Sequence, residues 1–151
     1  MAVGTVSGVD PANNWQLIST TTISSGTANY TLNGFDGYKT IMVLGKNIVK
    51  SADQITVAQF NGVTSGGVYN CINANGSYFF TGGSHATSGT ITMIVNDVDK
   101  SIGHQVEFTG YSAYGEIAYY TDPVPITSIK IYNNGGATYT SGTIYVYGIP
   151  A

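Results

Sequence analysis

The sequence predicts an all-β fold: a single-domain antiparallel β-sandwich of the jelly-roll type. Short runs rich in β-branched and aromatic residues recur along the chain, and clusters of Gly, Asn, Ser and Asp separate them. No stretch keeps an apolar period of 3.6 residues, so no helix longer than one turn is expected. The 151 residues suit one domain, and with Cys71 as the only cysteine no intrachain disulfide can form. Packing and backbone pairing must therefore hold the fold.

The chain is expected to divide into a short arm and one folded unit. Residues 1–13 are small and polar and precede the first strong strand signal, so we expect an N-terminal arm over 1–13 and the sandwich over 14–151. Turn signals bound each apolar or aromatic run, and strands at this spacing are typical of a sandwich or barrel. The expected strands are 15–23, 27–32, 38–48, 54–61, 67–72, 77–81, 90–96, 104–110, 115–120, 127–133 and 142–149.

Two of these strands carry patterns that predict their place in the sheet. Residues 41–44 are apolar on both faces, which is typical of a strand in the middle of a sheet or of one at a subunit contact. The last strand alternates, because successive side chains point to opposite faces. Its inward face is expected to hold Ile144 and Val146, and its outward face Tyr145 and Tyr147. The Gly-rich segments 64–67, 81–89 and 133–142 are expected to be loops or hairpin ends.

Charge is scarce in this chain, and this scarcity excludes several functions. Charged residues make up 9% of the sequence, with five lysines, no arginine and a net charge of −3, so no basic stripe for nucleic acid can be assembled. The longest strongly apolar run, 41–44, is too short to span a bilayer, and residues 1–9 lack the features of a signal peptide. We therefore expect neither a nucleic acid nor a membrane as partner. Low charge suits a protein that packs in numbers.

A pair of glutamates could carry acid–base chemistry only in one strand register. Glu107 and Glu116 would lie opposite each other if their hairpin were centred between residues 111 and 112. Like charges in that arrangement destabilise a sheet, so a shifted register with both groups solvated is the simpler interpretation. No motif of a nucleophilic or phosphate-binding site is present in the sequence. We predict that the protein is not an enzyme.

A metal or cofactor has little support in the sequence. Asn96, Asp97 and Asp99 could offer oxygen ligands to Ca²⁺, but the spaced loop of an EF-hand is missing, and a solvated turn is favoured over a metal site. Cys71 is interpreted as a small buried hydrophobic residue. Trp15, the first large apolar residue of the first strand, is expected to anchor the arm's exit to the core, with a surface stacking platform as the alternative.

The twelve tyrosines form the most informative excess. Tyrosine combines apolar area with a polar tip at low entropic cost, which favours contact surfaces. Two clusters stand out, one around the hairpin 104–120 and one around the last two strands. The alternative is that half or more of them pack inside the sandwich. The predicted partner-binding residues are Tyr111, Tyr114, Tyr119, Tyr120, Tyr139, Tyr145 and Tyr147.

Two stretches, one at each end, resemble β-sandwich proteins of tailed-bacteriophage virions. The first runs Trp15-Gln16-Leu17-Ile18-Ser19, then Thr22-Ile23-Ser24, then Leu32, Phe35 and Tyr38, into an apolar strand ending at Asn47. The second runs Ser128-Ile129-Lys130-Ile131-Tyr132, then a Gly-rich turn, then Gly142-Thr143-Ile144-Tyr145-Val146-Tyr147-Gly148-Ile149. Between them, Tyr69 and Tyr78 fall where that family tends to carry tyrosines. The resemblance covers little of residues 50–125.

The resemblance implies a jelly-roll fold and a place in a virion. Members of that family are capsid decoration (cement) proteins, head fibres, and the tips of tail fibres or receptor-binding proteins, and many are trimers. Fibre-tip members usually follow a long N-terminal stalk, whereas this sandwich is expected to begin at residue 14. A short arm laid across a capsid suits a decoration protein, so this role is expected first.

The expected function is therefore that of a non-enzymatic virion protein, made in the host cytoplasm and located on the capsid surface. It would bind as a homotrimer to the major capsid protein and stabilise the shell. The alternative is a receptor-binding module that recognises a host cell-surface glycan or protein through the loops 78–85 and 111–120. A glycan-cleaving enzyme using Glu107 and Glu116 is a distant third. Few Lys and Pro protect the sheet edges, so we expect oligomerisation or capsid contact to cover one edge.

Overall fold

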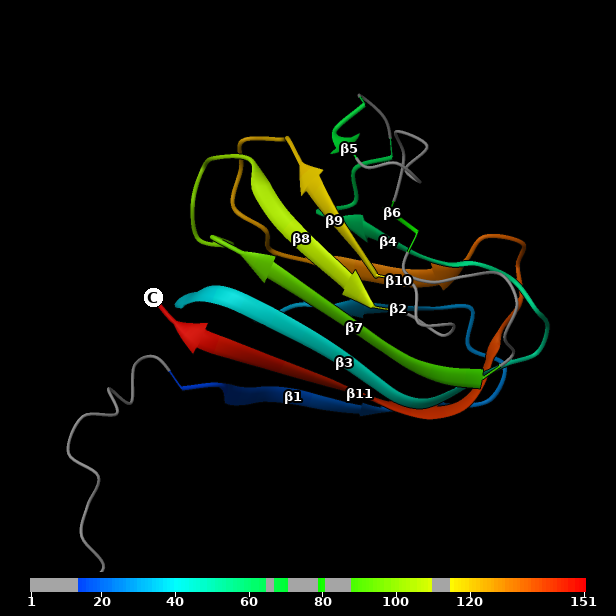
Figure 1. Ribbon diagram of the computed structural model, residues 1–151. Helices are drawn as coiled ribbons and strands as arrows, with labels where there is room; N and C mark the ends of the chain where they lie inside the picture. The colour runs from blue at the N-terminus through cyan, green and yellow to red at the C-terminus, as the bar shows by residue number, and fades with distance from the viewer. Residues whose placement is uncertain (1–13, 65–66, 71–78, 81–87, 110–114) are drawn as a thin grey trace, which may run out of the picture.

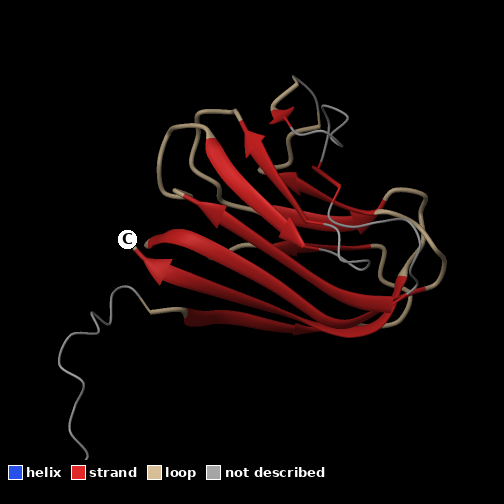
Figure 2. Ribbon diagram, viewed as in Figure 1, coloured by secondary structure: helices blue, strands red, loops and turns tan. Residues whose placement is uncertain are grey.

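The computed structural model describes residues 14–64, 67–70, 79–80, 88–109 and 115–151, and these form eleven β-strands without a helix (Figure 2). Each predicted strand is confirmed, and the largest difference in bounds is in the last one, which begins at Tyr139 instead of 142. The predicted arm, residues 1–13, lies outside the described residues. The strands are β1 Gln16–Thr22, β2 Asn29–Leu32, β3 Tyr38–Lys50, β4 Thr56–Phe60, β5 Tyr69–Asn70, β6 Phe79–Phe80, β7 Ser88–Asn96, β8 His104–Thr109, β9 Gly115–Tyr120, β10 Ile129–Asn133 and β11 Tyr139–Pro150.

The strands form two antiparallel sheets that pack on each other (Figure 1). The larger sheet has the order β1-β11-β3-β7-β8-β9-β5, and the smaller has the order β2-β10-β4-β6. Four of the strand pairs are β1 with β11, β2 with β10, β3 with β7, and β4 with β6. Pairs nested in this way are those of a double-stranded ribbon wound into two sheets, which is the jelly roll. The β8–β9 hairpin and β5 extend the larger sheet beyond β7.

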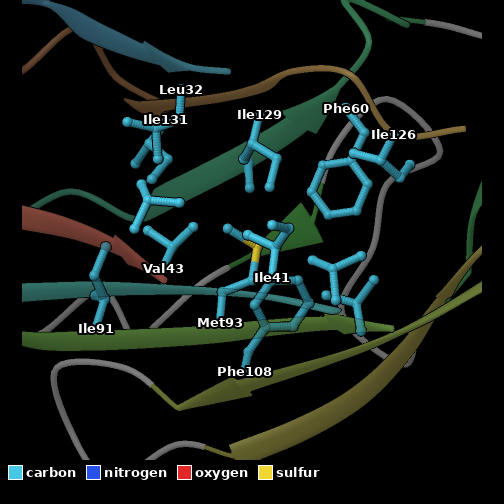
Figure 3. Packing of buried hydrophobic residues seen from close by; sticks show 14 of the residues in the cluster. Leu32, Ile41, Val43, Phe60, Ile91, Met93, Phe108, Ile126, Ile129 and Ile131 are labelled. Carbon is cyan, nitrogen blue, oxygen red and sulfur yellow. The ribbon is translucent and has the colours of Figure 1, made fainter. Parts of the chain in front are cut away.

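The core lies between the two sheets and follows from the alternation of each strand (Figure 3). On β3, Ile41 and Val43 point inward and have no exposed surface. Across the core, Ile129 and Ile131 of β10 are at most 1% exposed. The middle position predicted for 38–48 is confirmed, because β3 pairs with β11 on one side and β7 on the other.

A cluster of aromatic side chains fills the core at the end of the larger sheet that carries β9 and β5. The ring of Phe60 lies 5.2 Å from that of Tyr120 and 6.4 Å from that of Tyr69, centroid to centroid. The Tyr69 hydroxyl accepts a hydrogen bond from the Phe60 amide (2.9 Å) and donates one to the Val63 carbonyl (2.8 Å). Satisfied polar tips of this kind allow whole tyrosines to be buried in a core.

His104 ties the loop before β10 to the sandwich. Its ring has no exposed surface and stacks on Tyr120 at 6.2 Å. The ring nitrogens lie beside two backbone carbonyls: Nδ1 is 3.3 Å from the Asn96 oxygen and Nε2 is 2.8 Å from the Val124 oxygen. This buried histidine therefore joins the end of β7 to the segment that leads into β10.

The Gly-rich segment 133–142 is only partly a loop, which corrects the prediction made for it. β11 starts at Tyr139 and pairs with β3 through bulges on both sides of Ser141. At Gly142 the backbone has φ +128°, and a Cβ atom there would lie 2.9 Å from the Asn47 carbonyl oxygen. Glycine is thus required inside the strand, at a bulge, and its presence did not mark a turn.

Trp15 does not anchor the chain to the core, and this corrects the interpretation favoured from the sequence. Its side chain is 40% exposed and takes no part in the core cluster. The start of the sandwich is held instead by the pairing of β1 with β11, from Gln16 opposite Gly148 onward. No helix that could cross a membrane occurs in the described part of the chain.

Candidate interaction surface

The larger sheet has one face on the core and one turned away from the smaller sheet, here called the outer face. In Figure 1 the larger sheet lies in front, and no described segment crosses over it. Alternation along β3 and β11 assigns Met42, Leu44, Tyr145 and Tyr147 to this face, because Ile41, Val43, Ile144 and Val146 between them are buried in the core.

The strand register places these apolar side chains in one continuous row. Tyr147 pairs with a β1 residue on one side and a β3 residue on the other, and the row continues through β7 and β8 to β9. The row, in sheet order, is Leu17, Tyr147, Met42, Ile94, Glu107 and Ile117. Side chains directly opposite each other in antiparallel strands are close enough to touch. Five of these six side chains are apolar or aromatic.

The ends of the row are well exposed. Leu17 is 56% exposed and Ile117 58%, while Tyr147, Met42 and Ile94 are half-buried by their neighbours. Single exposed apolar residues are common on proteins, but a contiguous row across a sheet marks an interaction surface. The outer face therefore has the character of a contact surface.

Two of the predicted partner-binding tyrosines lie together on the outer face. The rings of Tyr145 and Tyr147 have centroids 6.4 Å apart and planes inclined by 24°. Both are half-buried, and the prediction that they share the face opposite Ile144 and Val146 is confirmed. A third, Tyr119 of β9, follows Ile117 by two residues and is 53% exposed.

Two other predicted residues are in the core and not on a surface, which corrects the expectation for them. Tyr120 has no exposed side chain and Tyr139 is 1% exposed. Tyr120 packs against Phe60 and Tyr69, its hydroxyl donates to Asp122 Oδ2 (3.2 Å), and burial raises its pKa. Tyr139 packs against Tyr30 at 5.6 Å. Neither ring is available to a partner in this structure. The remaining two, Tyr111 and Tyr114, lie outside the described residues.

The described strands place two charged side chains on the outer face. Lys46 follows Leu44 by two residues on β3 and is exposed. Glu107 of β8 lies opposite Ile94 and is also exposed. The Gln105 side chain donates to its carboxylate at 3.3 Å. Within the described residues, neither charge forms an ion pair; the salt bridge found there joins Lys100 and Asp99.

The two glutamates considered for catalysis are not opposite each other. β8 and β9 pair Glu107 with Ile117, and Glu116 with Phe108. The hairpin register is therefore shifted by one residue from the one that an acid–base pair would need. Because successive side chains alternate between faces, a shift of one residue places Glu107 and Glu116 on opposite faces of the sheet. The shifted register is confirmed and Glu107 is exposed, while the exposure of the Glu116 side chain lies outside the described residues.

The turn after β7 has the geometry of a tight connection. Asp97 has a positive φ of 54°, and its carbonyl accepts from the Lys100 amide at 2.9 Å. The Lys100 ammonium donates to the Asp99 carboxylate at 2.8 Å and holds the pKa of that carboxyl below its usual range. Asn96 accepts from the Thr40 hydroxyl at 3.4 Å. In the described parts of the chain, no group of three His, Cys, Asp or Glu side chains is placed to hold a metal.

Sequence reasoning identified the tyrosines of the outer face but missed Leu17, Ile94 and Ile117. A usable signal existed for part of the set, because the run 41–44 is apolar on both faces and β7 repeats this pattern over residues 93–95. Both strands lie in the middle of the larger sheet. No model of a known protein family matches the chain, and no curated protein is similar to it in sequence.

Proposed function

We propose that this protein is a non-enzymatic structural protein of a tailed-bacteriophage virion. In this proposal it decorates the capsid surface as a homotrimer and stabilises the shell by bridging neighbouring major capsid subunits. The single observation that carries the proposal is the uncovered apolar outer face of the larger sheet. Exposing apolar side chains to water is unfavourable in free energy, and contact with another protein surface removes them from solvent.

Two further features support an assembly role. The jelly roll agrees with the fold implied by the resemblance to virion β-sandwich proteins, which the motifs at both ends of the chain carry. The low charge of the chain limits repulsion between copies packed at high density on a shell. The proposed activity needs no cofactor, nucleic acid or membrane.

Binding to capsids tests the proposal. Purified protein is mixed with phage capsids that lack it, and the capsids are pelleted and heated. We expect saturable co-sedimentation with one trimer per lattice site and a higher temperature of capsid disruption. A matched variant, Met42→Ser with Ile94→Ser, should bind less, because it makes the centre of the outer face polar. Absence of the chain from the pellet at every concentration would exclude the decoration role.

The competing function is recognition of a host cell-surface glycan or protein. The observation that favours it is Tyr119, whose side chain is 53% exposed at the β9 end of the outer face. An exposed tyrosine can stack on an apolar ligand face and donate a hydrogen bond to it. Saturable binding of the protein to host cells, lost in Tyr119→Ala and retained in Tyr120→Phe, would favour this function over capsid decoration.

A further inference from the structure

The outer face carries one charge of each sign on opposite sides of an apolar centre. Lys46 lies toward one end of β3, and Glu107 lies two strands away on β8. Between them are Met42, Leu44 and Ile94, which are half-buried within one chain. The described strands place no other charged side chain on this face.

These two charges are too far apart to pair within one chain. Lys46 is four residues beyond Met42 along β3, and the row through Met42 reaches Glu107 after crossing β7. At about 3.4 Å per residue and about 4.8 Å between strands, their backbones are roughly 17 Å apart. Both side chains therefore have their charge available to a second surface.

We propose that a second copy of this chain occupies the outer face, with Lys46 of one copy against Glu107 of the next. Met42, Leu44 and Ile94 are then turned toward the centre of the assembly, where the outer faces of the copies meet, and the charged groups lie at the rim. This contact deepens the proposed function, on whose trimer it rests, by naming the surface that joins the copies.

Charge complementarity is what selects a copy of the same chain as the partner. A surface made for a charged ligand would carry one sign, whereas this face carries Lys46 and Glu107 on either side of its centre. Placing the Lys46 side of one face beside the Glu107 side of the next brings unlike charges together and turns the apolar centres of the copies toward one another. Like charges brought together across an interface oppose binding, so this arrangement also fixes the relative orientation of the copies.

The same contact closes a ring of three. In a trimer each chain offers its Lys46 side to one neighbour and its Glu107 side to the other, which is a head-to-tail contact that closes after three steps. In a dimer the two contacts would instead be reciprocal. The ring of three and the reciprocal dimer therefore respond differently to charge reversal.

The test uses charge reversal in the full chain, with mass measured by sedimentation equilibrium. Lys46→Glu and Glu107→Lys alone should each raise the dissociation constant of the assembly at least about tenfold. The double variant, which restores unlike pairs, should return to within about threefold of the unsubstituted protein. Lys130→Glu, the same charge change on the smaller sheet, is the matched control and should leave the mass unchanged. Circular dichroism confirms that each variant is folded.

Mixing the two single variants identifies the symmetry. A reciprocal dimer would recover in the mixture, because each chain then supplies charges of one sign. A ring of three always contains two identical neighbours, so we expect no recovery in the mixture and full recovery in the double variant. Recovery in the mixture would support the contact but contradict the trimer of the proposed function.

Two outcomes overturn the inference. One is an unsubstituted chain that stays monomeric at all concentrations. The other is an assembly that neither single reversal weakens, because another surface then joins the copies. Capsid binding that persists in either case would support the decoration role without this contact, so the failure of this inference and the failure of the decoration role are distinguishable.

Discussion

At the scale of single residues, tyrosine serves two different purposes in this protein. Tyr69 and Tyr120 are buried whole, and each has a partner for its hydroxyl: Tyr69 the Phe60 amide and Val63 carbonyl, and Tyr120 the Asp122 carboxylate. Tyr145 and Tyr147 keep their rings on the outer face. The difference follows from strand alternation and from whether a polar partner lies within reach of the buried tip.

The Tyr69 hydroxyl can be tested directly. Tyr69→Phe removes the acceptor of the Phe60 amide (2.9 Å) and leaves that buried amide without this partner. We expect the free energy of unfolding to fall by about 1–3 kcal/mol, measured by urea denaturation at pH 7. Tyr119→Phe is the control, since its side chain is 53% exposed, and it should change stability by less than about 0.5 kcal/mol. Equal effects of the two variants would argue against the buried hydrogen bond.

The same residue predicts how stability depends on pH. Burial raises the pKa of Tyr69 to about 12 from its ordinary 10.0, since the charged phenolate is disfavoured in the core. In the unfolded chain the phenol loses its proton at lower pH, so the unfolded state binds fewer protons above pH 10. The contribution of Tyr69 to the free energy of unfolding should therefore be constant below about pH 9 and fall as pH rises from 10 through 12.

Denaturation at a series of pH values measures this decline, and Tyr69→Phe should show a shallower one. The pKa of Tyr120 is raised by the same cause, so part of the decline should remain in that variant. An unchanged slope in Tyr69→Phe would mean that this phenol does not titrate differently in the folded and unfolded states.

At the scale of elements, the sequence predicted the strands far better than their partners. All eleven were located because Gly, Asn and Asp bound each apolar run, and these residues favour turns through local backbone preferences. The register of β8 and β9 was not determined by such preferences, and one residue separated the catalytic interpretation from the observed pairing of Glu107 with Ile117. Register depends on which face the core takes, which is a property of the whole fold.

Neighbouring residues of β3 provide a test of the two faces of the larger sheet. Ile41 is fully buried and Met42 is half-buried on the outer face. Ile41→Ala should lower the free energy of unfolding by about 2–5 kcal/mol, because it opens a cavity in the core. Met42→Ala should lower it by less than about 1 kcal/mol when measured at a protein concentration where the chain is monomeric. A larger loss from Met42→Ala would mean that the outer face is part of a core.

At the scale of the whole molecule, the jelly roll follows from the nested strand pairs. The resemblance implied this fold, but the nesting could not be read from the local patterns of the sequence. Local patterns specify which residues extend, but the pairing of β1 with β11 joins segments more than 120 positions apart, such as Gln16 and Gly148. The candidate surface was predictable only where a local pattern within one strand was enough to assign a residue to a face. Tyr145 and Tyr147 were assigned from alternation alone, whereas the row from Leu17 to Ile117 exists only once six strands are in register.

Trp15 and Tyr120 show where composition misleads. A large aromatic residue is expected in a core, yet Trp15 is 40% exposed because it precedes the first pair of β1. Tyr120 was expected on a contact surface, yet it is buried. The Asp122 carboxylate accepts a hydrogen bond from its hydroxyl, and the rings of Phe60 and Tyr69 pack against its ring. In both cases the outcome depended on contacts that only the assembled sandwich provides.

The central claim is that the outer face of the larger sheet is an assembly surface on a virion. The most direct test is a cryo-EM reconstruction of the phage particle that we propose carries this chain. The account predicts density for three copies around a symmetry axis of the capsid, with the row from Leu17 to Ile117 buried between copies and Lys46 beside the neighbour's Glu107. Copies at the tail tip, or copies on the shell whose outer faces are open to solvent, would contradict it.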